Sequence, residues 1–200
     1  MTNLKLYSAL ILIVSTGFSF QDVSPELTKW VIESGCSLKV AGATNVNKFN
    51  CTILNYANPD TLTFYRNNTG AAVKVAGSIS VAVQQFDCQH AMITRDLRKT
   101  LKSAVYPQLV IKFINLSRYP EFGTHTQSIK GLVSIELAGV TKQYQVDYRF
   151  IPDGTKSLTL IGNRQVNFSD FDLTPPKKAG GMIKTKDELD VEFNLKLKVI

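Results

Sequence analysis

The sequence has few of the residues that most often carry out chemistry. Its 200 residues include only two histidines, His90 and His125, and three cysteines. A closed zinc site needs four ligands at regular spacing, and these residues do not supply that pattern. The sequence has no Gly-x-Ser-x-Gly motif, no His-Glu-x-x-His motif and no glycine-rich phosphate loop. It therefore predicts no catalytic residue, no metal and no cofactor.

Asp170 and Asp172 are the best remaining candidates for a pair of acid–base carboxylates. They stand in the segment Phe168-Ser169-Asp170-Phe171-Asp172, which leads into a proline turn. Aspartates in such turns usually accept hydrogen bonds from backbone amides. We therefore expect a structural role for both, and the protein is predicted not to be an enzyme.

The chain is basic, with 23 Lys and Arg against 16 Asp and Glu, a net charge of +7. Basic residues do not alternate with aromatic ones in the manner of nucleic-acid-binding proteins, so no nucleic acid is expected as a partner. A moderate positive charge instead favours contact with anionic membrane surfaces or cell-wall polymers.

The first twenty residues differ from the rest of the chain. Lys5 precedes an unbroken apolar run from Leu6 to Val14, which small residues follow. This pattern is typical of a secretory signal peptide, and the run is shorter than the roughly 20 apolar residues that span a membrane. We predict a signal peptide over residues 1–20, cleavage between Phe18 and Asp22, and a mature domain over residues 21–200 that is periplasmic or secreted.

Strict alternation of apolar and polar residues dominates the mature chain. It is clearest from Asp190 to Val199, where every second side chain is apolar. Such alternation predicts strands with one buried face. Strands are expected near residues 30–32, 37–41, 46–56, 62–65, 73–86, 109–116, 128–138, 142–150, 157–162 and 188–199. Turn residues separate them and no linker divides the chain, so the sequence predicts one antiparallel all-β domain.

One segment, from Met92 to Val105, has helical periodicity instead. Its apolar residues recur every three or four positions, and Pro107 follows it. The opposite side carries four basic residues, which are Arg95, Arg98, Lys99 and Lys102. These four are predicted to contact an anionic membrane surface. The alternative is an ordinary solvated helix face.

Export would place the three cysteines in an oxidising compartment, where disulfides persist. Cys51 shares the inward parity of Phe49 and Ile53, and Cys88 follows a predicted strand. We predict a Cys51–Cys88 disulfide and a free Cys36. The alternative is three reduced, buried cysteines.

Several segments together resemble the YceI-like family of exported bacterial proteins, over roughly Trp30 to the C-terminus. They are Thr44-Asn45-Val46-Asn47-Lys48-Phe49, Thr94-Arg95-Asp96-Leu97, Leu101-Lys102-Ser103, Tyr106-Pro107, residues 129–135, Ala138-Gly139-Val140-Thr141-Lys142, and residues 162–171 with Pro175-Pro176. Their order and spacing carry the resemblance more than any one of them. Gln143 departs from it, because the family usually has proline after the Gly-Val-Thr-Lys turn.

The resemblance implies a closed, eight-stranded, lipocalin-like antiparallel β-barrel with one amphipathic helix beside it. It also implies an interior that takes a long apolar molecule, since some members are similar in binding polyisoprenoids, and it implies no catalytic site. The expected ligand is therefore a polyisoprenoid or another lipid, held for storage or transport.

The inward parity of the strands supplies candidate residues for the lining of the barrel. They are Phe49, Ile79, Val81, Ile111, Phe113, Val133, Ile135, Val146, Tyr148, Phe150 and Phe193. Gly77 and Gly131 are expected to leave space among them. An eight-stranded barrel either holds one small ligand or is filled by its own side chains. The rival hypothesis is thus a filled barrel whose surface binds a protein or an anionic cell-envelope polymer. Whether the protein forms a homodimer is left open.

Overall fold

The long C-terminal strand organises the fold, which the computed structural model describes for residues 26–56, 58–66 and 72–200. β12 (Ile183–Val199) pairs with β10 along most of its length, with β2 through its first part and with β1 at its end. Its alternating side chains therefore face the interior over its whole second half. The predicted signal peptide and its cleavage site lie outside the described residues.

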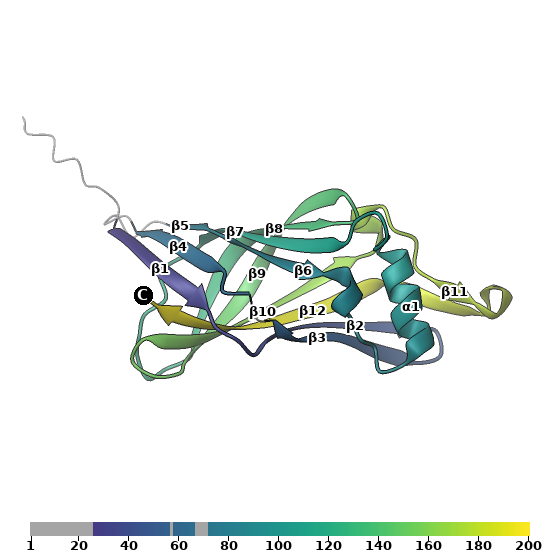
Figure 1. Ribbon diagram of the computed structural model, residues 1–200, viewed down its shortest axis with the longest axis horizontal. Coiled ribbons are helices and arrows are strands. Elements are labelled where there is room, and N and C mark those ends of the chain that lie inside the picture. Colours follow the sequence, from purple (N-terminus) through teal and green to yellow (C-terminus); the bar gives the residue numbers. More distant parts are fainter. Residues whose placement is uncertain (1–25, 57, 67–71) are drawn as a thin grey trace, which may run out of the picture.

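The remaining elements follow in chain order, and Figure 1 shows their arrangement. The strands are β1 (Glu26–Ile32), β2 (Cys36–Thr44), β3 (Lys48–Tyr56), β4 (Thr61–Arg66), β5 (Val73–Ala76), β6 (Ser78–Ala82), β7 (Gln108–Leu116), β8 (Gln127–Leu137), β9 (Val140–Pro152), β10 (Ser157–Asn167) and β11 (Lys177–Lys178). The helix is α1 (Ala91–Thr100), and the short 3-10 turns are η1 (Val83–Gln85), η2 (Ser169–Phe171) and η3 (Ala179–Gly181).

Eight antiparallel strands close into a ring in the order β1-β4-β5-β7-β8-β9-β10-β12, and β12 pairs back onto β1. The prediction of an all-β, closed, eight-stranded antiparallel fold with one helix is confirmed. The interior is a continuous apolar core that runs the length of the ring. In the described part of the chain, no helix is long and apolar enough to cross a membrane.

One side of the ring is built from interrupted strands. β2 continues the path of β1, β3 leads into β4, and β6 follows β5 after a break at Gly77. The prediction of one strand over residues 73–86 was therefore wrong. Gly77 has a φ of +144°, and a Cβ there would lie 2.6 Å from the Thr61 carbonyl oxygen, so the chain must break its strand geometry at this point.

β3 and β6 lie on this interrupted side but share no ladder. The chain just beyond β6 and η1 is joined to β3 where Thr52 and Asp87 exchange two backbone hydrogen bonds of 2.7 and 2.9 Å. We call this boundary between β3 and β6 the seam. The Cys51–Cys88 disulfide stands directly beside the Thr52–Asp87 bridge, so the closure of the seam depends on two neighbouring links.

α1 lies across the end of the ring from which the β11–β12 hairpin projects (Figure 1). The helix ends at Thr100, whereas the periodicity predicted a helix as far as Val105. The reason is a left-handed residue, Lys102, with a φ of 52°. The amides of Lys102 and Ser103 bond back to the carbonyls of Lys99 and Arg98, an arrangement that ends a helix and that usually uses glycine. No glycine marks this position in the sequence.

Aromatic side chains fill the opposite end of the ring. Trp30 is fully buried, and its ring centroid lies 4.7 Å from that of Phe64. Its indole nitrogen donates a hydrogen bond of 3.2 Å to the Tyr119 hydroxyl. The ring centroid of Phe122 lies 5.4 Å from that of Trp30. This cluster plugs one end of the interior, which leaves the α1 end as the better candidate for an entrance.

Candidate functional site

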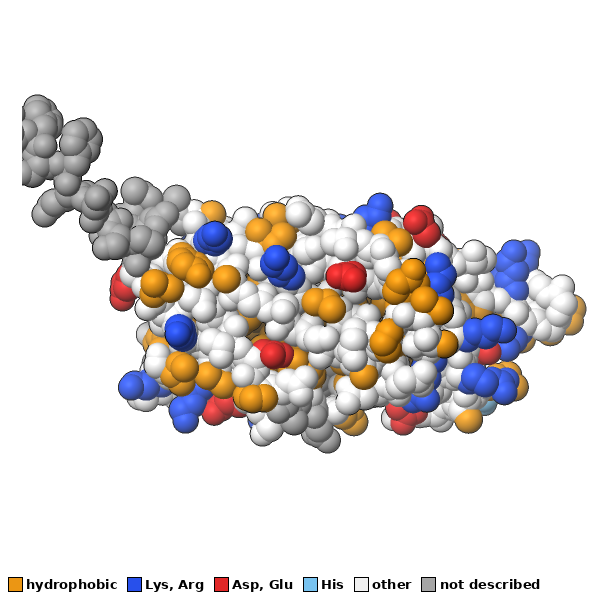
Figure 2. Space-filling model, turned by 45° about the horizontal axis from the view of Figure 1, so that its top comes forward, with side chains coloured by type: hydrophobic (Ala, Val, Ile, Leu, Met, Phe, Trp, Pro, Cys, Tyr) orange, Lys and Arg blue, Asp and Glu red, His pale blue; other side chains and the backbone are white. Residues whose placement is uncertain are grey.

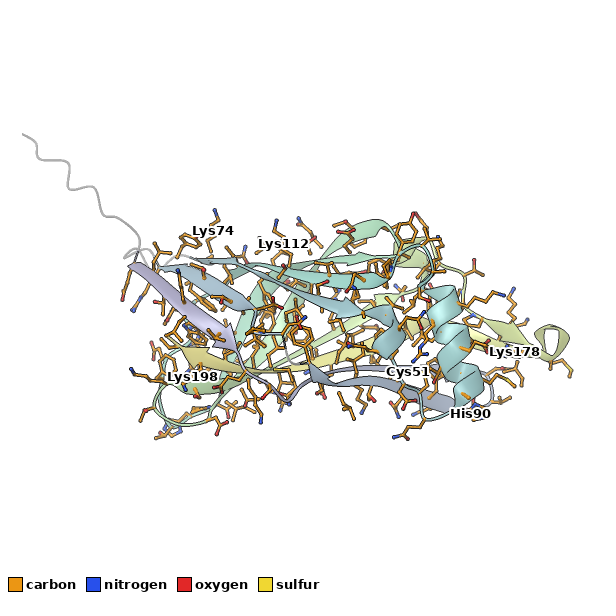
Figure 3. All side chains as sticks on the ribbon, in the orientation of Figure 1. Cys51, Lys74, His90, Lys112, Lys178 and Lys198 are labelled. Carbon is orange, nitrogen blue, oxygen red and sulfur yellow. A yellow bond between two sulfur atoms is a disulfide. The ribbon has the colours of Figure 1, made fainter. Side chains whose placement is uncertain are left out.

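The structure places the predicted lining residues in the interior, with one exception. Ten of them are buried in the apolar core: Ile79, Val81, Ile111, Phe113, Val133, Ile135, Val146, Tyr148, Phe150 and Phe193. Phe49 is only partly buried and lies at the α1 end, beside the helix. In Figure 3 side chains fill the space between the walls, whereas Lys74 and Lys112 point away from it.

Three inward-facing glycines each lie under an aromatic ring from another strand. A Cβ on Gly42 would lie 2.4 Å from the Phe49 ring, and one on Gly162 would lie 2.3 Å from the Phe193 ring. A Cβ on Gly131 would lie 2.6 Å from the Tyr148 ring and equally close to a backbone carbonyl. The expectation that Gly77 and Gly131 leave space for a ligand was therefore wrong, because Thr61 and Leu62 lie against Gly77 and the Tyr148 ring lies against Gly131.

Gly162 lies between two of these aromatic residues in the sheet. It is in register with Tyr148 on β9 and with Phe193 on β12. The rings of Tyr148 and Phe193 lie 5.8 Å apart, and Phe113 lies 6.4 and 6.2 Å from them. We call Phe113, Tyr148 and Phe193 the aromatic triad. It occupies the middle of the interior, where a ligand chain would have to pass.

Two small cavities remain in the interior, one beneath α1 and one beside the triad. The larger, about 50 Å³, lies beneath the helix, and the smaller, about 20 Å³, lies behind the seam. Leu38 and Ile111 line both, so the two cavities are neighbours. The smaller one is also lined by Phe193. Typical small-molecule pockets measure about 300 to 1,000 Å³, so the structure shows the interior in a nearly filled state.

A larger groove opens to solvent at the α1 end, between the helix, the β2–β3 turn and the β11–β12 hairpin. We call it the end groove, and its volume is about 340 Å³. Its apolar lining comes from Phe49, Met92, Ile93, Leu97, Phe168 and Ile183. Leu97 also lines the larger interior cavity. This buried side chain therefore borders both the end groove and the interior cavity.

Exposed apolar residues and lysines surround the end groove. Val46, Met92 and Met182 are 65%, 51% and 74% exposed. Lys178 bridges the groove through an ion pair of 2.8 Å with Asp96 on α1. Figure 2 shows Lys and Arg side chains gathered over the end of the molecule that carries α1 and the hairpin. The groove thus opens on a surface that is both apolar and basic.

The four basic residues predicted on the helix come together on the outer side of α1. Arg95, Arg98, Lys99 and Lys102 all line one open recess between the helix and residues 84–89. Arg98 is also engaged with the backbone, because its guanidinium donates hydrogen bonds of 2.8 and 3.2 Å to the Phe86 carbonyl oxygen. The other three point to solvent more freely, which leaves them as the better candidates for contact with an anionic surface.

Tyr148 carries a polar atom that the protein does not satisfy. Its side chain is fully buried, and its hydroxyl is the buried side-chain polar atom without a hydrogen-bond partner among the described residues. Burial raises the pKa of this phenol. Buried tyrosine hydroxyls usually find a partner, and leaving a buried polar group unsatisfied costs about 1 to 3 kcal/mol. A hydrogen-bond acceptor placed beside this hydroxyl would therefore stabilise the interior.

The cysteines behave as the parity of the strands predicted. Cys51 and Cys88 form a disulfide, and Cys36 is free and buried. Burial raises the pKa of the Cys36 thiol, and its sulfur lies 3.1 Å from the Glu33 carbonyl oxygen. This thiol is therefore protonated and structural.

Asp170 has the structural role that its turn indicated. Its carboxylate accepts hydrogen bonds of 2.8 Å from the Tyr144 hydroxyl and 2.9 Å from the Asn167 amide. Burial raises the pKa of Asp170, but these hydrogen bonds outweigh burial and lower it overall. Asp172 adopts a left-handed φ of 52° at the end of η2. The two aspartates close a turn.

Sequence reasoning named Phe193 as a lining residue but missed the part that three other residues play in the site, Gly162, Leu97 and Trp30. Gly162 and Phe193 meet across two strands, and no sequence signal pairs positions that far apart. Leu97 was assigned to the apolar helix face, but only the fold shows that it borders both a groove and a cavity. Trp30 offered a signal, because it is the single tryptophan of the chain.

Comparison with solved structures places this fold among known ones. A polyisoprenoid-binding domain from Saccharophagus degradans, implicated in plant cell wall breakdown, superposes with a TM-score of 0.58 at 8% identity and covers 86% of this chain and 98% of its own. BcnA of Burkholderia cenocepacia gives 0.54 at 13% identity, covering 80% and 95%. A cysteine mutant of the Campylobacter jejuni YceI protein gives 0.50 at 13% identity, covering 68% and 78%.

The chain has the fold of YceI proteins. At 8% and 13% identity these likenesses concern the fold alone, and they confirm the resemblance that the sequence motifs indicated. No protein-family model and no curated protein matches the chain. The ligand and the role of the protein must therefore be argued from its own residues.

Proposed function

We propose that the protein is a non-catalytic binder that holds one long apolar ligand, a polyisoprenoid or another lipid, inside the ring for storage or transport. The observation that carries this proposal is the contact of Leu97 with both the end groove and the interior cavity. One buried side chain thus borders both an apolar groove that opens to solvent and the apolar interior. The similarity in fold to a polyisoprenoid-binding domain supports the same conclusion.

The ligand would enter from the end groove, pass Leu97, and follow the two cavities toward the aromatic triad. Because these cavities measure only about 50 and 20 Å³, loading requires the triad rings to move aside. Burial of about ten methylenes contributes about 8 kcal/mol, against an association cost of about 4 kcal/mol or more. A long chain therefore has enough binding energy to displace the rings, whereas a short one has little to spare.

We also propose that the α1 end contacts an anionic membrane surface when the ligand is exchanged. Met92 and Met182 are exposed beside the end groove, and Arg95, Lys99 and Lys102 line the neighbouring recess. Each basic residue near such a surface contributes about 1 kcal/mol, and salt screens this attraction. That is enough to concentrate the protein at a membrane without anchoring it. A periplasmic or secreted location suits this role and the Cys51–Cys88 disulfide.

The central test is extraction of the purified protein with organic solvent, followed by mass spectrometry of the extract. We expect one long-chain lipid per protein. The emptied protein should take up a prenyl lipid again from vesicles, as measured by native mass spectrometry, which also reports whether the protein is a dimer. An empty extract together with no uptake would overturn the proposal.

The small interior cavities favour one rival, a filled barrel that binds a protein or an anionic polymer at its surface. The two proposals differ in what fills the core. If the protein neither carries nor takes up lipid but is retained on an anionic polymer column at physiological salt, the rival is correct.

The membrane contact has its own test. Replacing Lys99 and Lys102 with Gln should slow lipid transfer to anionic vesicles at low salt and leave transfer to neutral vesicles unchanged. Lys74→Gln with Lys112→Gln is the matched control, because these lysines are exposed on the outer wall away from α1 (Figure 3). Equal slowing of transfer by both pairs of substitutions would show that the effect depends on the net charge of the protein and not on the position of the lysines.

A further inference from the structure

Most buried polar side-chain atoms of the ring have a hydrogen-bond partner, as the Trp30 indole nitrogen does. The Tyr148 side chain is fully buried, and its hydroxyl has no partner among the described residues. By contrast, the hydroxyl of Tyr144 on the same strand bonds Asp170 at 2.8 Å. The strand therefore satisfies one of these tyrosines at the surface and leaves the other unsatisfied in the core.

The surroundings of Tyr148 explain how a ligand could reach it. Its ring lies against Gly131 and in register with Gly162, so the wall behind it is bare backbone. In front of it lies Phe193, at 5.8 Å between ring centroids, and Phe193 also lines the smaller cavity. The same movement of Phe193 that admits a ligand chain would bring the chain beside the Tyr148 hydroxyl.

The charge of the interior limits what this hydroxyl can bind. No lysine, arginine, histidine, aspartate or glutamate among the described residues is buried. A phosphate or carboxylate placed beside Tyr148 would be a buried, unpaired charge, which is strongly unfavourable. A neutral oxygen atom would accept a hydrogen bond from the phenol without that penalty.

Resting on the proposed function, we infer that Tyr148 is a polar subsite inside the ring and that the natural ligand is a long apolar chain bearing a neutral oxygen, such as a hydroxyl or a carbonyl. The phenol donates a hydrogen bond to that oxygen. The ligand thus satisfies the buried polar side-chain atom that lacks a partner among the described residues, and the subsite discriminates against pure hydrocarbons and against charged lipids.

The test compares three 15-carbon prenyl probes, which are the alcohol farnesol, the hydrocarbon farnesene and the acid farnesoic acid at neutral pH. Affinities are measured for the wild type, Tyr148→Phe and the control Tyr144→Phe. Removal of the Tyr148 hydroxyl should weaken farnesol binding about tenfold, equivalent to about 1.4 kcal/mol, and leave farnesene binding unchanged. Farnesoic acid should bind weakly to all three proteins. Tyr144→Phe should keep the wild-type preference for farnesol.

A spectroscopic readout separates a direct hydrogen bond from an effect on folding. The carbonyl stretch of bound farnesylacetone should lie at lower wavenumber in the wild type than in Tyr148→Phe, because only the phenol can donate to it. If Tyr148→Phe binds farnesol as the wild type does, or if the carbonyl stretch is the same in both, the subsite is refuted while the proposed function stands. If the wild type binds neither farnesol nor farnesene, the proposed function itself fails, and this inference with it.

Discussion

Replacement of Gly162 by alanine should destabilise the protein by forcing the aromatic triad to move. The added Cβ would lie 2.3, 2.7 and 2.8 Å from three atoms of the Phe193 ring. Phe193 is only 6% exposed, and the rings of Phe113 and Tyr148 lie within 6.2 and 5.8 Å of it. The cavity that Phe193 lines measures only about 20 Å³, so the ring has little room in which to retreat.

The magnitude follows from two opposing contributions. Overpacking of a filled core costs about 1 to 3 kcal/mol, whereas replacing glycine by alanine restricts the unfolded chain and returns about 0.4 to 1 kcal/mol. We expect a net loss of about 1 to 2 kcal/mol in the free energy of unfolding. For a domain of this size that corresponds to a fall in Tm of about 2 to 8 °C.

Urea unfolding of the wild type, Gly162→Ala, Phe193→Leu and the double variant measures both the loss and its cause. Leucine is shorter than phenylalanine, so the double variant should be more stable than the sum of the two single changes predicts. Gly123→Ala is the control, because a Cβ there meets nothing within 4 Å. Gly162→Ala with wild-type stability, or strict additivity in the double variant, would refute this account of the interior.

Three further predictions concern the edges of the site. Replacing Cys51 and Cys88 with serine should cost about 3 to 4 kcal/mol in urea unfolding, since the disulfide closes a loop of 37 residues; an unchanged midpoint would contradict this. Because the pKa of Asp170 is lowered from 3.8 in the folded state, its carboxylate stabilises the fold above that pH and loses its effect as pH falls through the folded value. The stability difference between the wild type and Asp170→Asn should therefore shrink below about pH 4 in acid titrations, and a pH-independent difference would argue against it. Leu97→Ala should speed lipid uptake measured by stopped-flow fluorescence, and an unchanged rate would place the entrance elsewhere.

Much of the barrel wall was predictable because a strand with one buried face alternates apolar and polar residues along the sequence. β12 alternates over ten residues, and its inward side chains are the ones that the pattern indicated. The same reasoning gave the inward parity of Cys51 and hence its disulfide. The apolar residues before and after Gly77 occupy alternate positions in the same parity. The alternation therefore continues through the break between β5 and β6, and the interruption at Gly77 was missed.

The filling of the interior could not be predicted for a different reason. Phe193 covers Gly162, and Tyr148 covers Gly131, through contacts between residues on different strands. A glycine in a predicted strand indicates that the position leaves room inside the barrel. Whether a neighbouring aromatic ring fills that room depends on the pairing register of the strands and on the rotamer of the aromatic side chain. The unsatisfied Tyr148 hydroxyl has the same origin, since the residue type is visible in the sequence and the missing partner is not.

The uneven construction of the ring has a mechanical consequence. β7, β8, β9, β10 and β12 run without interruption and are held by long ladders, so they form a stiff half-shell. On the other side β1, β4, β5 and β6 are short, and β3 and β6 share no ladder, so that the seam is held by the Thr52–Asp87 bridge and the neighbouring Cys51–Cys88 disulfide. A guest that swells the core would push this interrupted side outward at little cost in hydrogen bonds. The capacity of such a container is set by the compliance of its weaker half and not by its resting volume.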